Sequence, residues 1–301
     1  MAKGGSGFRG WIENAVARTL LGVALALPYR WRVPLIGKIV AYGVAPVAGY
    51  SKRVHANLRH TMPELDQAER RRIARAVADN FGRTLIEIYS GEDFVDRARA
   101  APLEGSGVAA LEAARAAGRP VILITAHLGN YDAARGKLAR EGYEMAALYR
   151  PMRNASFNQH YVNAISTIAA PVFPTNARGI TSLIKHLKDG GVIGIVADVA
   201  SLKAPILSFF DQPAHTPLSA AEWAIKYDAA LIPIFGIRQP DGLSFRVLLE
   251  DPLAHSTPDA MMQAYNDVVE RVARAHPEQW FWIHRRWKQR AEVSADAPPP
   301  E

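Results

Sequence analysis

The chain has 301 residues and no cysteine, so disulfide bonds, thiolate metal sites and a cysteine nucleophile are excluded. Hydrophobic residues make up 49% of the chain and charged residues 22%, which is typical of a folded globular protein and not of a disordered one. The net charge of +7 favours an anionic partner, which could be nucleic acid, anionic lipid or an acidic protein. A merely soluble basic protein would carry the same charge.

Two apolar stretches, residues 11–28 and 33–50, dominate the N-terminal part of the chain. The apolar centre of the first, residues 19–27, is too short to cross a bilayer, which needs roughly 20 apolar residues. Aromatic and basic side chains at residues 29–32 are typical of the lipid headgroup zone. We therefore expect residues 1–50 to form a helical, membrane-associating segment. Two core helices of a soluble protein, or a secretory signal, would give a similar pattern.

Residues 51–91 are polar and read as helical. Asp66 follows Pro63 and begins an acidic first turn, which is the pattern of a capped helix start. The apolar residues that follow recur at helical spacing and predict a face packed in the core. They are Ile73, Val77, Phe81, Leu85, Ile86 and Ile88.

From about residue 101 onward, short apolar runs alternate with helical patterns. Residues 120–125 are apolar and β-branched, as in a strand buried on both faces, and residues 131–141 then read as a helix. Further strands are expected at residues 144–149, 192–197, 230–237 and 243–248. This rhythm predicts an α/β fold with a mostly parallel central sheet flanked by helices, over residues 51–290. Residues 291–301 are expected to be a disordered tail.

His127 follows the predicted strand at residues 120–125, at the carboxyl end where ligands bind in open α/β sheets. Asp132 comes five residues later, across a turn that contains Gly129. A carboxylate on one imidazole nitrogen would leave the other free to take a proton, so the pair is a candidate general base. No G-x-S-x-G elbow supplies a serine for a triad, so the pair would act directly on a substrate hydroxyl. A structural turn histidine gives the same pattern.

Several motifs resemble one family. Residues 126–132, AHLGNYD, resemble the H-x4-D/E motif of glycerolipid acyltransferases. Residues 277–288, PEQWFWIHRRWK, are close to the P-E-Q-W-x-W-x-H-R-R-W-K ending of the lipid A biosynthesis acyltransferases that add secondary acyl chains. Shorter resemblances to that family lie at residues 57–65, 148–151, 177–179, 187–191, 197–198, 209–210 and 216–217. The resemblance covers about residues 10–290.

The resemblance implies transfer of a fatty acyl group from acyl carrier protein, or acyl-CoA, to a hydroxyl of a membrane glycolipid, with a lipid A precursor as the expected acceptor. His127 would be the base and Asp132 would orient it. Backbone amides near Gly129 and Asn130, or an arginine, would stabilise the oxyanion. No metal or organic cofactor is expected. The expected location is the cytoplasmic face of the inner membrane, with anionic lipid and the membrane surface, not nucleic acid, as partners.

Three other side chains are candidates for substrate binding. Arg150 and Arg178 carry guanidinium groups that would grip phosphate, although surface ion pairs would explain them equally well. Asp198, which ends the apolar run at residues 192–197, would hold an arginine or polarise the acceptor, or would be half of a buried structural pair. The aromatic and basic residues at 280–288 would suit either the headgroup interface or stacked nucleic-acid bases.

The chain departs from the family pattern around the acceptor site. Asp198 is followed by Val199, where the family commonly has Gln or His, and Phe210 is followed by Asp211, where it has Gly. The acid at position 132 is Asp where the lipid A branch commonly has Glu, and an arginine common in the family has no counterpart near Ile165. The acceptor therefore stays open. A phosphatidylinositol mannoside, a lysophospholipid and a non-catalytic, membrane-binding role are the alternatives.

Overall fold

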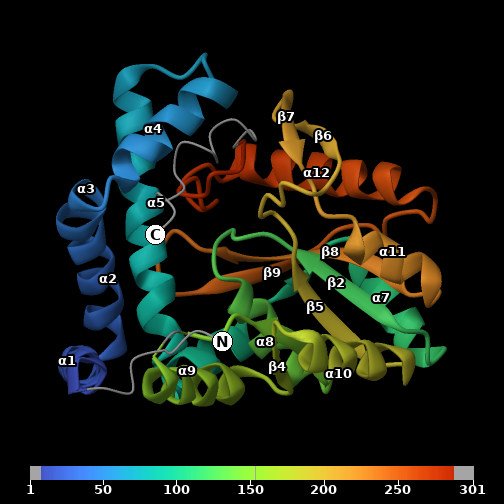
Figure 1. Cartoon of the computed structure of the whole chain (residues 1–301), viewed down its shortest axis with the longest axis horizontal. Coiled ribbons are helices and arrows are strands. Elements are labelled where there is room, and N and C mark those ends of the chain that lie inside the picture. Colours follow the sequence, from blue (N-terminus) through green and yellow to red (C-terminus); the bar gives the residue numbers. More distant parts are fainter. Residues whose placement is uncertain (1–7, 153, 288–301) are drawn as a thin grey trace, which may run out of the picture.

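The computed structural model describes residues 8–152 and 154–287, and its centre is a seven-stranded sheet (Figure 1). The strand order is β1-β9-β8-β2-β5-β3-β4, and every neighbouring pair is parallel except β8 with β9. The strands are β1 (Leu103–Glu104), β2 (Val121–Thr125), β3 (Met145–Tyr149), β4 (Val172–Pro174), β5 (Val192–Val196), β8 (Ala230–Arg238) and β9 (Phe245–Leu249). The predicted α/β class with a mostly parallel sheet is confirmed. The expected tail at residues 291–301 lies outside the described residues.

Alternate side chains of each central strand point to opposite faces of the sheet and build two apolar cores. Ile122 and Ile124 of β2 belong to one core, and Val121 and Leu123 to the other. The first core is closed by helices α10 (Ala177–Lys188), α11 (Ser219–Lys226) and α12 (Pro258–Ala275), and the second by α6 (Glu92–Ala100), α7 (Gly107–Ala116), α8 (Tyr131–Arg140) and α9 (Ala155–Ile168). Burial on both faces explains why the central strands read as continuous apolar runs.

An N-terminal helical layer stands beside the sheet (Figure 1). It consists of α1 (Phe8–Leu25), α2 (Tyr29–Ile39), a π-helical turn η1 (Val40–Val44), α3 (Ala45–Val47), α4 (Tyr50–Thr61) and α5 (Gln67–Ile88). The Asp66 side chain accepts a hydrogen bond from the Glu69 amide, so it caps α5 as predicted. Helices α2 and α5 pack closely at Gly82, where a Cβ would lie 2.8 Å from the Ile36 carbonyl oxygen.

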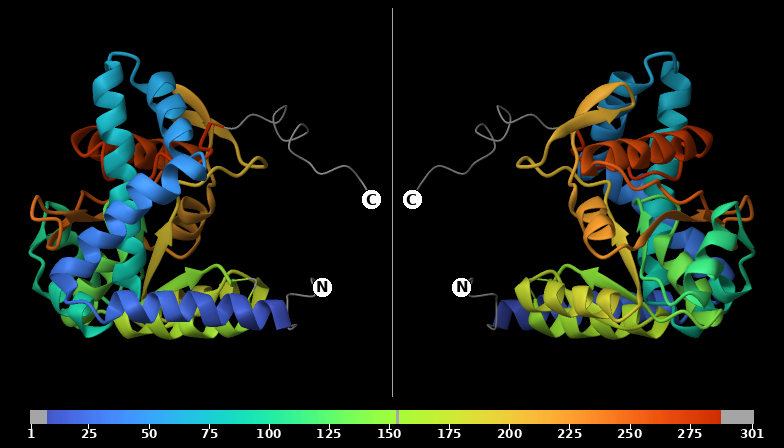
Figure 2. Two further views of the ribbon diagram at one scale, coloured as in Figure 1. Left: turned by 90° about the vertical axis from the view of Figure 1, so that its left-hand side faces the viewer. Right: turned by 90° about the vertical axis from the view of Figure 1, so that its right-hand side faces the viewer.

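The outer surface of this layer is apolar at many positions. Large hydrophobic side chains that are exposed there are Val16, Leu20, Val23, Trp31, Leu35, Ile39, Tyr42, Val44 and Val47. Within the described ranges, no single helix is long and apolar enough to cross a membrane, although the bent pair Tyr29–Val47 and Tyr50–Thr61 meets the criteria of length and composition when taken together. Helix α1 runs along the edge of the molecule (Figure 2).

Three features were not predicted from the sequence. Strands β1 and β4 are too short to leave a pattern, and strand β9 runs antiparallel to β8. A hairpin of β6 (Ile206–Phe209) and β7 (Gln212–His215) forms a separate two-stranded sheet. Its strand β6 is tied to α12 by the Asn266 side chain, which donates to the Ser208 carbonyl oxygen.

Candidate active site

His127 lies in the turn that joins the buried strand β2 to helix α8. Asn130 ends this turn and caps α8, because its side-chain oxygen accepts from the Asp132 amide at 3.0 Å. Gly129 has φ +60°, and a Cβ on it would lie 2.1 Å from the Gly236 carbonyl oxygen of β8. Only glycine fits this conformation and this close approach, so the turn is fixed next to His127.

Helix α5 and strand β8 hold the same turn from outside. The Asn80 amide and the Thr84 hydroxyl donate to the Gly129 carbonyl oxygen at 3.1 and 3.2 Å. The side-chain amide of Asn130 donates to Glu87 Oε2 at 2.8 Å. Glu87 is fully buried, and Arg238 neutralises it at 2.5 Å. A charged pair of this kind, surrounded by hydrogen bonds, rigidly positions the turn.

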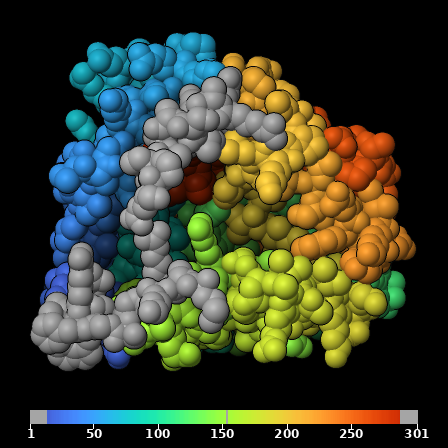
Figure 3. All heavy atoms as spheres, viewed as in Figure 1, coloured from blue at the N-terminus to red at the C-terminus, as the bar shows by residue number. Residues whose placement is uncertain are grey.

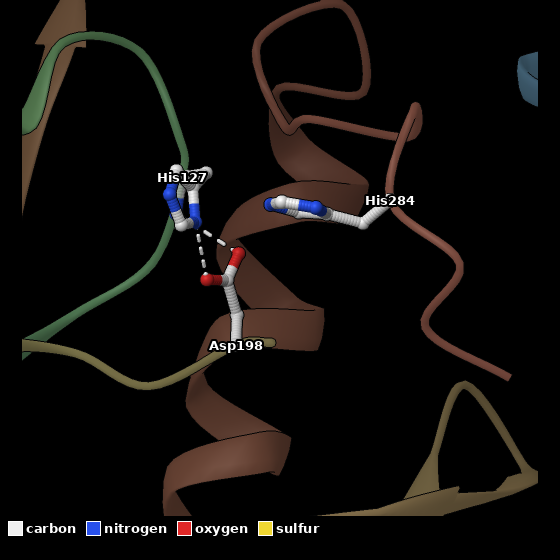
Figure 4. Close-up of side chains that lie close together, drawn as sticks. All are labelled: His127, Asp198 and His284. Carbon is white, nitrogen blue, oxygen red and sulfur yellow. Dashed lines mark hydrogen bonds and ion pairs between the residues drawn. The ribbon is translucent and has the colours of Figure 1, made fainter. Parts of the chain in front are cut away.

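The His127 imidazole is held by Asp198, which follows β5 (Figure 4). The distance from His127 Nδ1 to Asp198 Oδ1 is 2.7 Å, and the His127 amide donates to Asp198 Oδ2 at 2.9 Å. The Trp280 indole also donates to Asp198 Oδ2, at 2.9 Å. The two residues meet because β2 and β5 are adjacent and parallel, so their carboxyl ends lie side by side.

Charge and burial set the protonation of this pair. Burial alone would raise the pKa of Asp198, but the positive charge and hydrogen bonds of His127 outweigh it and hold the pKa below its ordinary value. Burial likewise opposes the charge on His127, yet Asp198 keeps the pKa of His127 above its ordinary value. The ionised carboxylate therefore accepts a hydrogen bond from the Nδ1–H group, and Nε2 of the neutral ring is left to act as a base.

The sequence led us to expect that Asp132 contacts and orients His127, and this prediction is wrong. Asp132 lies in the first turn of α8 and pairs with Arg135 at 2.5 Å, both side chains being buried. Arg135 also donates to the Ala169 carbonyl oxygen at 2.6 Å, which ties α8 to the end of α9. The helix begins between the two motif residues, and this turns the Asp132 carboxylate toward α9 instead of the imidazole.

The backbone amides that were expected to stabilise an oxyanion already have partners. The Gly129 amide donates to the Gln279 carbonyl oxygen at 3.0 Å, and the Asn130 amide to that of Gly236 at 2.8 Å. The Leu128 amide donates within the turn, to Ala126. These bonds shape the turn, so this stretch of backbone offers no free donor to substrate.

A second histidine, His284, lies against the pair (Figure 4). Its ring centroid is 4.6 Å from that of His127, and its buried Nε2 has no hydrogen-bond partner among the described residues. Burial, together with the nearby positive charges of His127, Arg286 and Arg53, outweighs the attraction of Asp198 and lowers the pKa of His284 to about 4. This imidazole is therefore neutral at physiological pH, with an unused nitrogen near the base.

One cluster in the described part of the chain has the composition of a metal site. Nitrogen and oxygen atoms of His127, Asp198 and His284 lie within 4.8 Å of one another. Both oxygens of Asp198 already bind His127, and one of them also binds Trp280. The donor set therefore fits a hydrogen-bonded base better than a metal ion.

Two cavities meet at this centre. A cavity of about 660 Å³ runs along the sheet, and one of about 250 Å³ lies against α5; both are lined by His127, Tyr131 and His284. The space-filling view shows atoms of the red C-terminal segment at the bottom of a hollow between the N-terminal helices and the rest of the molecule (Figure 3). The larger cavity falls within the usual range of ligand pockets.

Only some of the other predicted binding residues line a cavity that contains His127. Arg150 is exposed and lines the larger cavity, whereas Arg178 is exposed in α10 and lines neither cavity that contains His127. Gly129 lines the smaller cavity. The side chain of Asn130 is fully buried and is used in the turn.

The aromatic and basic motif at residues 280–288 does not form, over its described residues, the exposed surface patch that the sequence analysis had offered as an interpretation. Trp280 and Trp282 are fully buried, and Arg286 donates to the His215 carbonyl oxygen at 2.7 Å from a buried position. The Phe281 amide donates to the His127 carbonyl oxygen at 2.8 Å. The segment is thus a wall of the site, and the indoles of Trp280 and Trp282 are not available to stack on bases or to lie among lipid headgroups.

Comparison with known proteins places the chain in a family. Residues 7–289 match the family of bacterial lipid A biosynthesis acyltransferases. The chain belongs to this family. Its relatives include the lipid A biosynthesis lauroyltransferase of Escherichia coli K12, 26% identical over 250 residues, or 80% of each chain. The lipid A biosynthesis acyltransferase of Haemophilus influenzae is 24% identical over 85% of this chain and 81% of its own.

A third relative acts on a different lipid. The phosphatidylinositol mannoside acyltransferase of Mycobacterium tuberculosis H37Rv is 23% identical over 218 residues, which are 70% of this chain and 69% of its own. These relatives agree on acyl transfer in their names and differ in the acceptor. This protein is accordingly an acyltransferase of the lipid A biosynthesis type.

Proposed function

We propose that this acyltransferase moves a fatty acyl group from a thioester donor to a hydroxyl of a membrane glycolipid, with His127 as the base and Asp198 as the residue that orients it. The hydrogen-bonded pair at the ends of two parallel strands carries the proposal. Nε2 of His127 takes the proton of the acceptor hydroxyl as its oxygen attacks the thioester carbonyl carbon. The C–S bond then breaks, the thiolate takes the proton back from His127, and an ester and a thiol leave.

His284 is proposed to stabilise the oxyanion of the tetrahedral intermediate. Its neutral ring lines both cavities at the point where they meet, and its buried Nε2 has no hydrogen-bond partner within residues 8–152 and 154–287. An N–H at this position would donate to the carbonyl oxygen of the thioester as negative charge develops on it. This role replaces the one expected of the backbone near Gly129.

The larger cavity suits the acyl chain. Apolar side chains from strands of the central sheet line it, among them Leu123, Met145 and Ile234. Met145 lies over Gly194, where an added Cβ would be 2.5 Å from the end of the methionine side chain. Met145 would therefore set the depth of the cavity and the length of the chain that it accepts, while Arg150 at the lining would contact an anionic part of donor or acceptor.

The proposed donor is acyl carrier protein or acyl-CoA, and the proposed acceptor is a lipid A precursor. Similarity to the lauroyltransferase of Escherichia coli over 80% of both chains supports this acceptor. The relative that acts on a phosphatidylinositol mannoside supports a second candidate, because its identity to this chain is nearly as high. A lysophospholipid acceptor, or a non-catalytic relative, has no such observation in its favour.

Membrane association at the cytoplasmic face of the inner membrane completes the proposal. The exposed apolar side chains of residues 16–47 lie in the segment expected to associate with the membrane, and the acceptor is a lipid. Helix α2 of this segment also packs into the fold, since Tyr29 and Val33 are buried with residues of the sheet. The segment would thus link the membrane to the catalytic domain instead of being a separate anchor.

Mass spectrometry of lipids from cells with and without the gene tests this function. Loss of one ester-linked acyl chain from lipid A, restored by the wild-type gene and not by His127→Gln, is expected. Loss from a mannoside instead would establish the second acceptor. An unchanged lipid profile, with the protein shown to be produced in the wild type, would contradict acyl transfer to either glycolipid.

A further inference from the structure

A basic groove lies on the outer side of α5, away from the catalytic centre. Its volume is about 600 Å³, and its walls come from α5 on one side and from α2 and η1 on the other. The basic residues in these walls are Lys38, Arg71, Arg72 and Arg75, and Tyr42 and Asp79 also line it. Nothing in the acyl-transfer mechanism uses any of these side chains.

The positive charge of this groove is only partly compensated. Arg72 pairs with Glu69 at 2.7 Å, and Asp79 pairs with Arg83. The described part of the chain provides no ion pair for Lys38, Arg71 or Arg75, all of which are exposed. Three unpaired cations around one groove favour a ligand with a compact negative charge, such as a phosphate.

An apolar strip on α2 and η1 adjoins these cations. Leu35, Ile39 and Tyr42 are 44%, 49% and 69% exposed. Helical spacing places them on the face that also carries Lys38. A free phosphate would use only the cations, whereas a phospholipid at a membrane surface would place its phosphate in the groove and its hydrocarbon against the apolar strip.

The groove and the catalytic centre lie on opposite faces of one helix. Residues Val77, Phe81 and Thr84 of α5 line the cavity that contains His127. Arg71, Arg75 and other residues nearer the start of α5 line the groove. A lipid in the groove would therefore hold α5 at the membrane with the catalytic cavity on the other side of the helix.

We propose that the groove between α2 and α5 binds the phosphate headgroup of an acidic membrane phospholipid that is distinct from the acceptor lipid. The cations Lys38, Arg71 and Arg75 contact the phosphate, and Leu35, Ile39 and Tyr42 contact the acyl region. The site would recruit the enzyme to anionic membrane and orient it there. Binding of lipid at this site does not depend on any step of the acyl transfer.

Vesicle sedimentation with the full chain tests this site, using phosphatidylcholine vesicles with and without phosphatidylglycerol. Each Lys or Arg near an anionic surface contributes about 1 kcal/mol, which is about fivefold in affinity. The variant Lys38→Gln/Arg71→Gln/Arg75→Gln should therefore bind phosphatidylglycerol vesicles on the order of 100-fold more weakly. Its matched control is Arg140→Gln/Lys185→Gln/Lys188→Gln, which removes three exposed charges elsewhere and should bind within about threefold of wild type.

Four other outcomes would overturn the proposal. They are no preference of the wild type for phosphatidylglycerol, an equal loss in the control variant, displacement from vesicles by inorganic phosphate at constant ionic strength, and full binding by Leu35→Ser/Ile39→Ser. The equal loss would indicate attraction by net charge alone, and the last two a free-phosphate site. A melting curve for each variant shows that it is folded. Because no acyl transfer is measured, failure here is distinct from failure of the proposed reaction.

Discussion

The variant Asp198→Asn separates the two aspartates that could orient His127. Asn has nearly the same size, but its amide can accept with one oxygen only, whereas Asp198 accepts from the His127 ring, the His127 amide and the Trp280 indole. The variant would favour the wrong imidazole tautomer, with Nε2 protonated and unable to act as a base. By analogy with the orienting aspartate of serine proteases, kcat should fall by about 10³–10⁴-fold, or about 4–5.5 kcal/mol.

Asp132→Asn is the matched control. It breaks the buried Asp132–Arg135 pair, which is expected to cost about 3–5 kcal/mol of folding stability. It leaves the His127–Asp198 contact intact, so kcat per folded enzyme should fall by no more than about tenfold. Kinetics on purified protein, normalised to the folded fraction from a denaturant titration, give both values. A larger loss of kcat in Asp132→Asn than in Asp198→Asn would refute the assignment.

The pH dependence of kcat/KM is an independent test of the coupling between Asp198 and His127. Activity needs neutral His127, so kcat/KM should rise with pH through the pKa of His127, which Asp198 holds above its ordinary value. Removing the carboxylate lowers that pKa, so the acid limb of the residual activity in Asp198→Asn should move to lower pH. A shift of this limb to higher pH would contradict the coupling.

Three further substitutions probe the oxyanion donor, the turn and the acyl pocket. His284→Ala should lower kcat by about 10²–10³-fold with little change in KM, and His284→Gln, which keeps an N–H, should restore part of it; equal losses in both would remove the donor role. Gly129→Ala should cost at least about 3 kcal/mol by thermal or denaturant unfolding, since strain at positive φ and overlap with β8 add. The control Gly118→Ala, at φ +61° but in open space, should cost only about 1–2 kcal/mol. Equal losses of stability in the Gly129 and Gly118 variants would refute the overlap with β8. Met145→Ala should improve kcat/KM for a donor longer by two methylenes on the order of tenfold, at about 0.8 kcal/mol per methylene. The buried Met261→Ala, outside the cavity, should leave chain preference unchanged, and a shift in this control would assign the effect to general loosening.

Local pattern predicted the centre of the fold well. The continuous apolar runs of β2 and β8 follow from burial on both faces, and the Asp66 cap follows from a local hydrogen bond. Strand β4 has only three residues, and the antiparallel direction of β9 depends on the path of the chain between strands. Neither leaves a periodic signal.

The site shows where local reasoning ends. His127 could be placed at a strand end from its neighbours, but its partner depends on which strand lies beside β2. That strand is β5, so the acid 71 residues away contacts His127, and the one five residues away does not. Asp198 was already expected at the end of a strand, and the order of strands in the sheet was the missing information. His284 was likewise visible in a motif, but only the packed wall of Trp280 and Trp282 brings it to the base.

Single-turnover acyl transfer by purified enzyme tests the central claim most directly. Wild type and His127→Gln would be compared with an acyl carrier protein thioester and a lipid A precursor, the product being followed by mass spectrometry. We predict the same melting curve for both proteins and product formation at least about 10³-fold slower with His127→Gln. This is the result expected if His127 removes the proton of the acceptor hydroxyl as it attacks the thioester. Unchanged product formation by His127→Gln would contradict it.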